Sequence, residues 1–348
     1  MLGLTHSSWI NAWTLRQACA PLGVDLRVVA GPRQLPLPAA APGDAAEWLF
    51  FTEEASLRRA LAGGTRGARF LPTTFPDALL DDKFAFAEFL AADPDGPRGL
   101  AQCTLAELDH GAAVPSYPML LKARHSWLGD RKLPRGWVCR DAVELASRRR
   151  ALAAAQLDEA WFFLQEWLGD ASMRLLSVCG FFDAEAEARG LALVTERVAD
   201  YGGDGPTSSA MLVTAADAHD LVAAAARVLR RLRYRGPYEL EFIVAGGQVR
   251  ALELNPRFWM QHGLFLADGN GLVRRYLGMD SEAEPPAAPP KLLWVDGTWL
   301  LRRLLRADRR VLELWRTWVC QRGHRPVVCP SLGAALWAGL WRLAGGGR

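Results

Sequence analysis

Polar side chains recur at regular intervals between residues 238 and 257. Side chains of a β-strand alternate between its two faces, so in "YELEFIV" Glu239 and Glu241 share one face. The same rule places Glu253 and Asn255 together in "ALELNPR". Because a pair of glycines separates the two runs, we predict an antiparallel hairpin that presents these polar side chains together.

The register of this hairpin decides how close its carboxylates come. With a three-residue loop around Gly246–Gly247, Glu241 faces Glu253 and Glu239 faces Asn255 across the ladder. Carboxylates that face each other directly are destabilising, so a positive charge is expected between them. A hard divalent cation such as Mg²⁺, shared with a nucleotide phosphate, fits these oxygen ligands. The alternative is a hairpin face whose acidic residues point into water.

Lysine is rare in this chain, with four copies among 41 basic residues: Lys83, Lys122, Lys132 and Lys291. A compact ammonium is preferred over a guanidinium mainly at point-charge sites such as phosphates. Lys122 ends the apolar strand "YPMLLKA", where a lone cation is costly unless it meets an anion. Lys83 lies in the first turn of the helix "DDKFAFAEFLAA", where the helix dipole disfavours a cation. We therefore predict phosphate contacts for both, against the alternative of solvated surface lysines.

Other candidate residues are harder to separate from their neighbours. For the carboxylate of Glu166, in "WFFLQEW", we expect one of two partners: a ribose or adenine group, or a cation in an internal salt bridge. Arg257 follows the hairpin directly, and its guanidinium fork suits a carboxylate or an acyl phosphate. For Arg174 and Arg197 an internal salt bridge is an equal alternative. His262 could deprotonate an incoming amine, but its neighbours in "FWMQ" favour a packed histidine.

The elements that must position these residues change in pattern near residue 75. Before it, the helices "WINAWTLRQACAPLG" and "EEASLRRALAGG" alternate with the strands "VDLRVVA", "EWLFFT" and "ARFLP". This alternation predicts a small parallel α/β layer. After it, helices mix with antiparallel strand patterns, which predicts two α+β lobes rather than one doubly wound sheet. We predict four segments: an N-terminal α/β domain (1–75), the two lobes (76–281), a Pro/Ala linker (282–290) and a basic, tryptophan-containing C-terminal extension (291–348).

The extension carries eleven Lys and Arg against three Asp and Glu, so the rest of the chain is slightly acidic. Helical spacing in "TWLLRRLLRADRRVLELW" predicts an apolar stripe opposite the arginines, and hence a helix docked on the acidic body. The stripe comprises Trp299, Leu300, Leu304, Leu305, Val311, Leu312 and Trp315. Membrane contact through "SLGAALWAGLWRLAG", which is too short to span a bilayer, is a less favoured alternative, and nucleic acid is a distant third.

Several classes are excluded by composition and pattern. No apolar run reaches the roughly 18 residues that a bilayer span requires. The first residues lack a basic region and a cleavage site of the secretory kind. Six scattered cysteines without a C-x-x-C pair argue against a zinc site and a disulfide scaffold. We therefore expect a cytoplasmic protein whose body does not bind nucleic acid.

Taken in order, the motifs resemble the ATP-grasp superfamily, and more specifically its carboxylate–amine ligase branch. "GPYELEF" and "ALELNPRFW" are similar to that superfamily's metal-binding hairpin, and "DDKFAFAEFL" and "YPMLLKA" to its two lysine-bearing nucleotide segments. "FFLQEWLGD" is similar to the hinge strand beside adenine. "VTERVADYGGDGPTSS" looks like the loop over the phosphates, and "NPRFWMQHGL" like the turn that carries the substrate-side arginine. The glycine-rich lid is poorly matched by "ARHSWLGDRKLPRG", where Lys132 is an alternative phosphate contact.

The resemblance implies an ATP-grasp fold, in which two α+β lobes grip ATP, behind the small α/β domain and before a helical extension. It implies ATP and Mg²⁺, with Mn²⁺ as a substitute, as cofactors. The nucleotide-binding residues would be Lys83, Lys122, Glu166, Trp167 and Leu168. The metal ligands would be Glu241, Glu253 and Asn255, and the catalytic residues Arg257 and Arg197.

The implied activity is a ligation. A small-molecule carboxylate is activated as an acyl phosphate and captured by an amine, such as that of an amino acid or peptide, with release of ADP and phosphate. A thiol acceptor is less favoured, and a homodimer is left open. The alternatives are a phosphotransferase of the same fold, a nucleotide-binding module without turnover and, on the tail alone, a membrane- or polysaccharide-associated scaffold.

Overall fold

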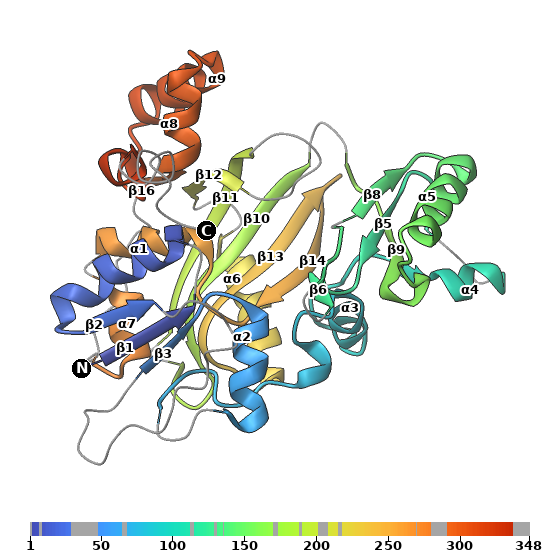
Figure 1. The fold of residues 1–348 in the computed structure, drawn as a ribbon, viewed down its shortest axis with the longest axis horizontal. Helices are drawn as coiled ribbons and strands as arrows, with labels where there is room; N and C mark the ends of the chain where they lie inside the picture. Colours follow the sequence, from blue (N-terminus) through green and yellow to red (C-terminus); the bar gives the residue numbers. More distant parts are fainter. Residues whose placement is uncertain are drawn as a thin grey trace. The chain divides into compact units, whose positions relative to one another are not determined.

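The computed structural model describes residues 2–6, 9–28, 48–64, 68–111, 115–128, 131–134, 136–169, 173–187, 190–200, 208–214, 218–268, 270–279 and 291–336 (Figure 1). The chain divides into two compact units. Unit 1 comprises Met1–Thr74, Ser177–Glu239 and Asn255–Arg348, and unit 2 comprises Phe75–Leu176 and Leu240–Leu254. The predicted domain boundaries stay a prediction, and the predicted linker, 282–290, lies outside the described residues.

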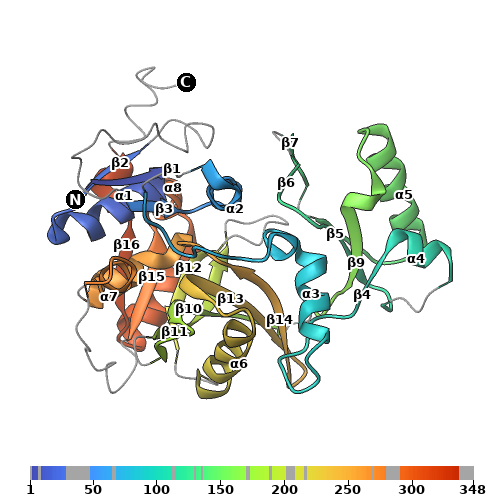
Figure 2. The ribbon, with the colours of Figure 1, turned by 90° about the horizontal axis from the view of Figure 1, so that it is seen from below.

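Unit 1 begins with the predicted parallel α/β layer (Figure 2). Strand β1 (Leu2–His6) lies between β2 (Asp25–Val28) and β3 (Trp48–Phe51), and both neighbours run parallel to it. Helix α1 (Trp9–Cys19) connects β1 to β2, and helix α2 (Glu54–Arg59) follows β3. The layer therefore has the predicted strand–helix alternation.

One predicted strand of this layer is wrong. "ARFLP" forms only an isolated bridge between Arg69 and Trp48, and the unpredicted β1 takes the central position. The N–H of Leu71 donates to the hydroxyl of Tyr276 at 3.3 Å instead of to a neighbouring strand. Pro72 then offers no N–H at all, so the ladder cannot continue beyond the bridge.

A seven-stranded sheet has the order β14-β13-β10-β11-β12-β15-β16. Its strands are β10 (Arg174–Asp183), β11 (Leu191–Asp200), β12 (Ser208–Val213), β13 (Arg235–Ala245), β14 (Gln248–Asn255), β15 (Leu292–Asp296) and β16 (Arg325–Cys329). Helix α6 (Ala218–Arg231) contacts β11. A 3-10 helix (Met260–Asp268) contacts both α1 and α7 (Gly271–Tyr276).

The C-terminal extension joins this sheet. Strand β15 pairs antiparallel with β12 and parallel with β16, although only helix was predicted here. Asp296 ends β15 and caps α8 (Gly297–Leu305), because its carboxylate accepts from the N–H groups of Thr298 and Trp299. Trp294 and Trp299 are buried in the cores that join the extension to the rest of unit 1. Residues 291–336 therefore dock on the body, whereas most of the last apolar segment, residues 337–348, lies outside the described residues.

The predicted apolar stripe is only partly correct. Leu304, Leu305 and Leu312 are exposed, while Trp299, Leu300 and Val311 are buried. Helix α8 ends at Leu305, Ala307 adopts a positive φ of 49°, and a new helix, α9 (Arg309–Leu314), begins beyond it. The break shifts the helical phase, so one continuous periodicity does not describe both helices. A π-helix (Trp315–Gln321) then leads toward β16.

Unit 2 has its own antiparallel sheet, in the order β4-β9-β5-β8, and a separate core. Its strands are β4 (Gln102–Thr104), β5 (Met119–Ala123), β8 (Gly136–Cys139) and β9 (Phe162–Glu166), with a small hairpin of β6 (Trp127–Leu128) and β7 (Arg131–Lys132). Its helices are α3 (Lys83–Ala91), α4 (Leu105–Asp109) and α5 (Ala142–Ala154). The mixture of α/β and α+β parts agrees with the predicted fold class. Within the described ranges, no helix is both long enough and apolar enough to cross a bilayer.

Docking of the extension has a measurable consequence for stability. Trp294→Ala removes a fully buried indole, so we expect a loss of about 3–5 kcal/mol in the free energy of unfolding. Leu305→Ala is the matched control, because that side chain is 77% exposed and should change stability by about 0.5 kcal/mol or less. Urea unfolding of the full chain measures both. Equal small losses for the two variants would contradict docking.

Candidate functional site

Lys122 sits inside the sheet of unit 2. Strand β5 pairs with β8 on one side, where Lys122 faces Gly136, and with β9 on the other, where it faces Phe163. Met119, Leu121 and Ala123 are buried in the core on the opposite face. A Cβ at Gly136, whose φ is 152°, would lie 2.6 Å from the carbonyl oxygen of Leu121. Only glycine therefore fits opposite Lys122.

The charge of Lys122 is poorly solvated. Burial lowers the pKa of its ammonium, while Glu253 raises this pKa, Lys83 lowers it and Glu241 raises it. The amine also donates to the side-chain oxygen of Gln165 at 3.5 Å. Two lysines and two glutamates are thus within electrostatic reach of one another in unit 2. This group, Lys83, Lys122, Glu241 and Glu253, is called the charge cluster below.

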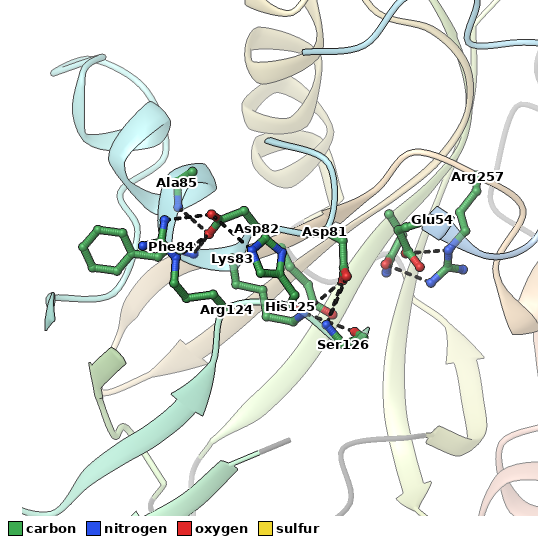
Figure 3. A network of polar contacts seen from close by, with 12 residues as sticks. Glu54, Asp81, Asp82, Lys83, Phe84, Ala85, Arg124, His125, Ser126 and Arg257 are labelled. Carbon is green, nitrogen blue, oxygen red and sulfur yellow. Dashed lines mark hydrogen bonds and ion pairs between the residues drawn. The ribbon is translucent and has the colours of Figure 1, made fainter. Parts of the chain in front are cut away.

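Lys83 is held at the start of α3 by both its backbone and its side chain. Its N–H donates to the carbonyl of Arg124 at 3.0 Å, which ties α3 to the end of β5. Its ammonium lies 3.5 Å from a carboxylate oxygen of Asp81, 3.8 Å from one of Glu253 and 3.4 Å from the hydroxyl of Ser126 (Figure 3). The alternative of a solvated surface lysine is wrong, because the side chain is only 17% exposed.

Two aspartates that the sequence analysis did not identify hold the start of α3 beside the residues that follow β5 (Figure 3). Asp82 caps α3 by accepting from the N–H groups of its second and third residues, and it forms an ion pair with Arg124 at 2.8 Å. Asp81 adopts a left-handed φ of 64° and accepts from the N–H of Ser126 at 3.0 Å. The signal was the pair "DD" directly before Lys83, since Asp is favoured at N-caps and tolerates this backbone conformation.

The predicted hinge residues begin at Glu166, the last residue of β9. The N–H of Glu166 donates to the carbonyl of Ala101 at 2.8 Å, and its carboxylate accepts from the N–H of Ala101 at 3.2 Å. This bond to a peptide N–H is not the predicted salt bridge, and the predicted ribose or adenine contact of Glu166 stays a prediction. In the part of the chain that the structure describes, the peptide groups of Trp167 and Leu168 make no hydrogen bond to other residues.

The hairpin of β13 and β14 differs from prediction in its turn. Strand β13 ends at Ala245 and β14 begins at Gln248, and both intervening glycines have positive φ, as a two-residue type I′ turn requires. The predicted three-residue loop is wrong. Glu239 and Asn255 nevertheless meet as predicted, because the Asn255 amide donates to the Glu239 carboxylate at 3.0 Å.

Burial rules out the alternative of a hairpin face directed into water. Glu239 is 6% exposed and Asn255 is 8% exposed, while Glu241 and Glu253 are half-buried. The donors on this hairpin are carboxylate and amide oxygens, the ligands that Mg²⁺ prefers. Among the described residues, no group of three or more His, Cys, Asp or Glu could hold a metal ion alone. Two carboxylates and an amide, completed by phosphate and water, fit Mg²⁺ in the form it takes with nucleotides.

Arg257 belongs to unit 1, as do Glu54 and Asn255. Its guanidinium donates to the carboxylate of Glu54 at 2.6 Å and to the side-chain oxygen of Asn255 at 3.2 Å (Figure 3). Glu54 comes from the first turn of α2, more than 200 residues earlier, and sequence reasoning missed it. The ion pair fixes the guanidinium beside the end of the hairpin.

The remaining candidates are placed as follows. Arg197 lies on β11 opposite Met211, next to a bulge, and Arg174 begins β10. They belong to different units, and their roles stay predictions. His262 is buried, its Nδ1 lies 2.5 Å from the carbonyl of Trp259, and its ring contacts the rings of Phe258 and Trp259. The packed-histidine interpretation is therefore correct.

The buried His262 predicts a pH dependence of stability. Burial lowers its pKa to about 4, against about 6.5 in the unfolded chain, so below pH 6.5 the unfolded state binds the extra proton. Stability should fall as the pH drops through this window, by about 2 kcal/mol between pH 7 and pH 5 from this group. In His262→Gln this part of the dependence should vanish. Urea unfolding at both pH values measures it, and an unchanged pH dependence in the variant would contradict the assignment.

Comparison with solved structures identifies the fold. The chain matches the ADP complex of an N5-carboxyaminoimidazole ribonucleotide synthetase with a TM-score of 0.62 and 15% identity, over 88% of this chain and 85% of that one. For the ADP-bound enzyme of Staphylococcus aureus, N5-carboxyaminoimidazole synthetase, the TM-score is 0.61 and the identity 11%, over 89% and 86%. For the biotin carboxylase domain of Hydrogenobacter thermophilus 2-oxoglutarate carboxylase, with MgADP and bicarbonate, the values are 0.60 and 13%, over 84% and 73%.

By sequence, no protein-family model and no curated protein matches the chain. At identities this low, the structural matches establish the fold of the chain but not the reaction that it performs. The predicted hairpin, the two lysine-bearing segments and the preceding parallel layer are all present in the described structure. Together with the structural matches, they show that this chain has the ATP-grasp fold.

Proposed function

We propose that this protein is an ATP-dependent ligase that activates a carboxylate as an acyl phosphate and couples it to an amine. The observation that carries the proposal is the charge cluster of unit 2. It puts two of the chain's four lysines within electrostatic reach of two glutamates, on a fold shared with ADP-bound enzymes. A poorly solvated cation such as Lys122 is stabilised by an anion, and a nucleotide phosphate supplies one.

In this proposal each part of unit 2 has a task toward the nucleotide. Lys83 and Lys122 neutralise the phosphates. The peptide groups of Trp167 and Leu168 would pair with adenine, and Glu166, which ends β9, holds the start of this hinge. Nucleotide complexes of two of the matching structures, with ADP and with MgADP, support this assignment.

Glu241, Glu253 and Asn255 would hold Mg²⁺. When bound, the metal neutralises charge on the terminal phosphates and keeps them in place. The chain's own residues prepare for it: Asn255 is held by Glu239 through its amide N–H and by Arg257 through its oxygen. An amide oxygen has two lone pairs, so the bond from Arg257 leaves one of them for a metal.

The proposed reaction has two steps. A carboxylate oxygen of the substrate, held near Arg257, attacks the γ-phosphorus of ATP, and the bond to the bridging oxygen of ADP breaks. The amine then attacks the acyl carbon, a proton is lost, and phosphate leaves. Arg197 would stabilise charge on the transferred phosphoryl group. As in other phosphoryl transfers, the protein contributes mainly positioning and charge stabilisation.

The substrates are small-molecule carboxylates and amines, and a screen identifies them. Purified protein is incubated with ATP, Mg²⁺ and a panel of carboxylates and amines, while ADP, phosphate and coupled products are measured. The proposal expects ADP release that needs both substrates. Phosphorylated product without amine dependence would indicate a phosphotransferase instead, and no turnover with any pair would indicate a binding module.

Loss of one metal ligand should stop turnover without unfolding the protein. Glu253→Gln removes one charge but keeps the shape of the side chain, so we expect a fall in kcat of about 10²–10³-fold. Glu88→Gln, an exposed position on α3, is the matched control and should retain full activity. Steady-state ADP release measures both. Near-full activity of Glu253→Gln would overturn the metal assignment.

Lys122, in "YPMLLKA", and Lys132, in "ARHSWLGDRKLPRG", should differ in their effect on nucleotide affinity. Lys122→Ala should weaken binding of a non-hydrolysable ATP analogue by about 10-fold or more, because its half-buried ammonium would face the phosphates. Lys132→Ala should have a much smaller effect. Calorimetric titration of both variants decides between them, and equal affinities would remove Lys122 from the phosphate site.

A further inference from the structure

We propose that the ammonium of Lys83 occupies, in the nucleotide-free protein, the place beside Glu253 that the metal takes in the loaded one. Binding of nucleotide then draws Lys83 from the carboxylate to the phosphates and opens Glu253 to the metal. This exchange rests on the proposed function. It adds that metal and nucleotide bind synergistically, and that Lys83 sets the size of this synergy.

The first observation is the position of the ammonium. Lys83 Nζ lies 3.8 Å from a carboxylate oxygen of Glu253, on the hairpin assigned to the metal. Both side chains are sheltered, with 17% and 27% of their surfaces exposed, so water screens the pair only in part. A cation this close neutralises much of the charge that would otherwise attract a divalent ion.

The second observation is that the Lys83 ammonium has other polar neighbours besides Glu253. Its ammonium also lies 3.5 Å from Asp81 and 3.4 Å from the Ser126 hydroxyl (Figure 3). The backbone N–H of Lys83 is fixed to Arg124, so the stem of the side chain starts from a constant point. Asp81 and Ser126 are themselves joined by a hydrogen bond of 3.0 Å. The ammonium can therefore leave Glu253 by a side-chain rotation without losing every polar neighbour.

The third observation is the charge balance of the cluster. The two ammonium groups stand against the carboxylates of Glu241 and Glu253, and Asp81 adds a third carboxylate 3.5 Å from Lys83, so the charge of both lysines is compensated without a ligand. A divalent cation alone would add two positive charges beside two ammonium groups, which is unfavourable. A nucleotide phosphate brings the negative charge that both the lysines and the metal need. Affinity for each ligand should therefore rise when the other is bound, by the same factor for both.

Binding of Mn²⁺ to the nucleotide-free protein tests the exchange. Electron paramagnetic resonance counts free Mn²⁺ as protein is titrated, without and with ADP. In wild type we expect weak binding alone and much tighter binding with ADP. Lys83→Met removes the charge but keeps the length of the side chain, so binding of Mn²⁺ alone should tighten by about tenfold, within the usual range of coupling. The enhancement by ADP should shrink accordingly.

Two control variants separate charge from other causes. Lys291→Met makes the same change of charge at an exposed lysine of unit 1 and should leave Mn²⁺ binding unchanged. Lys83→Arg keeps the positive charge and should bind Mn²⁺ alone as weakly as wild type does. Thermal unfolding of each variant establishes that it is folded.

The outcomes distinguish failure of the exchange from failure of the proposed function. If Lys83→Met binds Mn²⁺ alone no better than wild type, while ADP still enhances binding and Glu253→Gln abolishes that enhancement, the exchange is wrong and the metal site stands. If Glu253→Gln leaves Mn²⁺ binding with ADP intact, the metal site itself is wrong. Tighter binding in Lys83→Met together with loss in Glu253→Gln supports both.

Discussion

A cation placed inside a β-sheet must be compensated by negative charge, and this requirement organises unit 2. Lys122 is the last residue but one of β5, which lies between β8 and β9, and burial lowers the pKa of its ammonium. Two of the groups that raise this pKa again are the carboxylates of Glu253 and Glu241. In the described structure these carboxylates compensate the lysines, and in the proposed complex the nucleotide phosphates would take over that role.

The surrounding structure keeps this arrangement in place with few interactions. Gly136 lets β8 approach β5 opposite Lys122, and Asp82 starts α3 so that Lys83 lies in its first turn. In unit 1, the pair of Glu54 and Arg257 fixes the residue that follows the hairpin. Each of these contacts is local to its own unit. The chain thereby prepares the nucleotide side and the substrate side of the proposed reaction separately.

Much of the candidate site could be predicted because its signals are local. Alternation along two short strands placed Glu239 and Asn255 on one face, and the scarcity of lysine drew attention to Lys83 and Lys122. The three-residue loop was wrong because Gly246 and Gly247 both adopt positive φ, as a two-residue type I′ turn requires, and a pair of glycines between two strands is itself a sequence signal for that turn. Glu54 was missed because its contact to Arg257 spans more than 200 residues and no local pattern marks it.

The fold shows the same division between local and distant information. Most strands and helices of the parallel layer were predicted, but β1 was missed. The segment "ARFLP" does not form the predicted strand, because the N–H of Leu71 donates to Tyr276 and Pro72 has no N–H to donate. In the extension, burial of Trp299 followed from helical spacing. The β-strand role of Trp294 did not, because pairing of β15 with β12 joins residues about 80 positions apart.

The central claim is that the charge cluster of unit 2 binds a nucleotide together with a divalent metal. Crystals of the protein grown with ADP and Mn²⁺, measured at the manganese absorption edge, test it most directly. The account predicts one anomalous peak within bonding distance of Glu253 and a phosphate oxygen, with Lys122 on the phosphates. Manganese and nucleotide bound away from Glu253 and Lys122, or nucleotide bound there without metal, would contradict it.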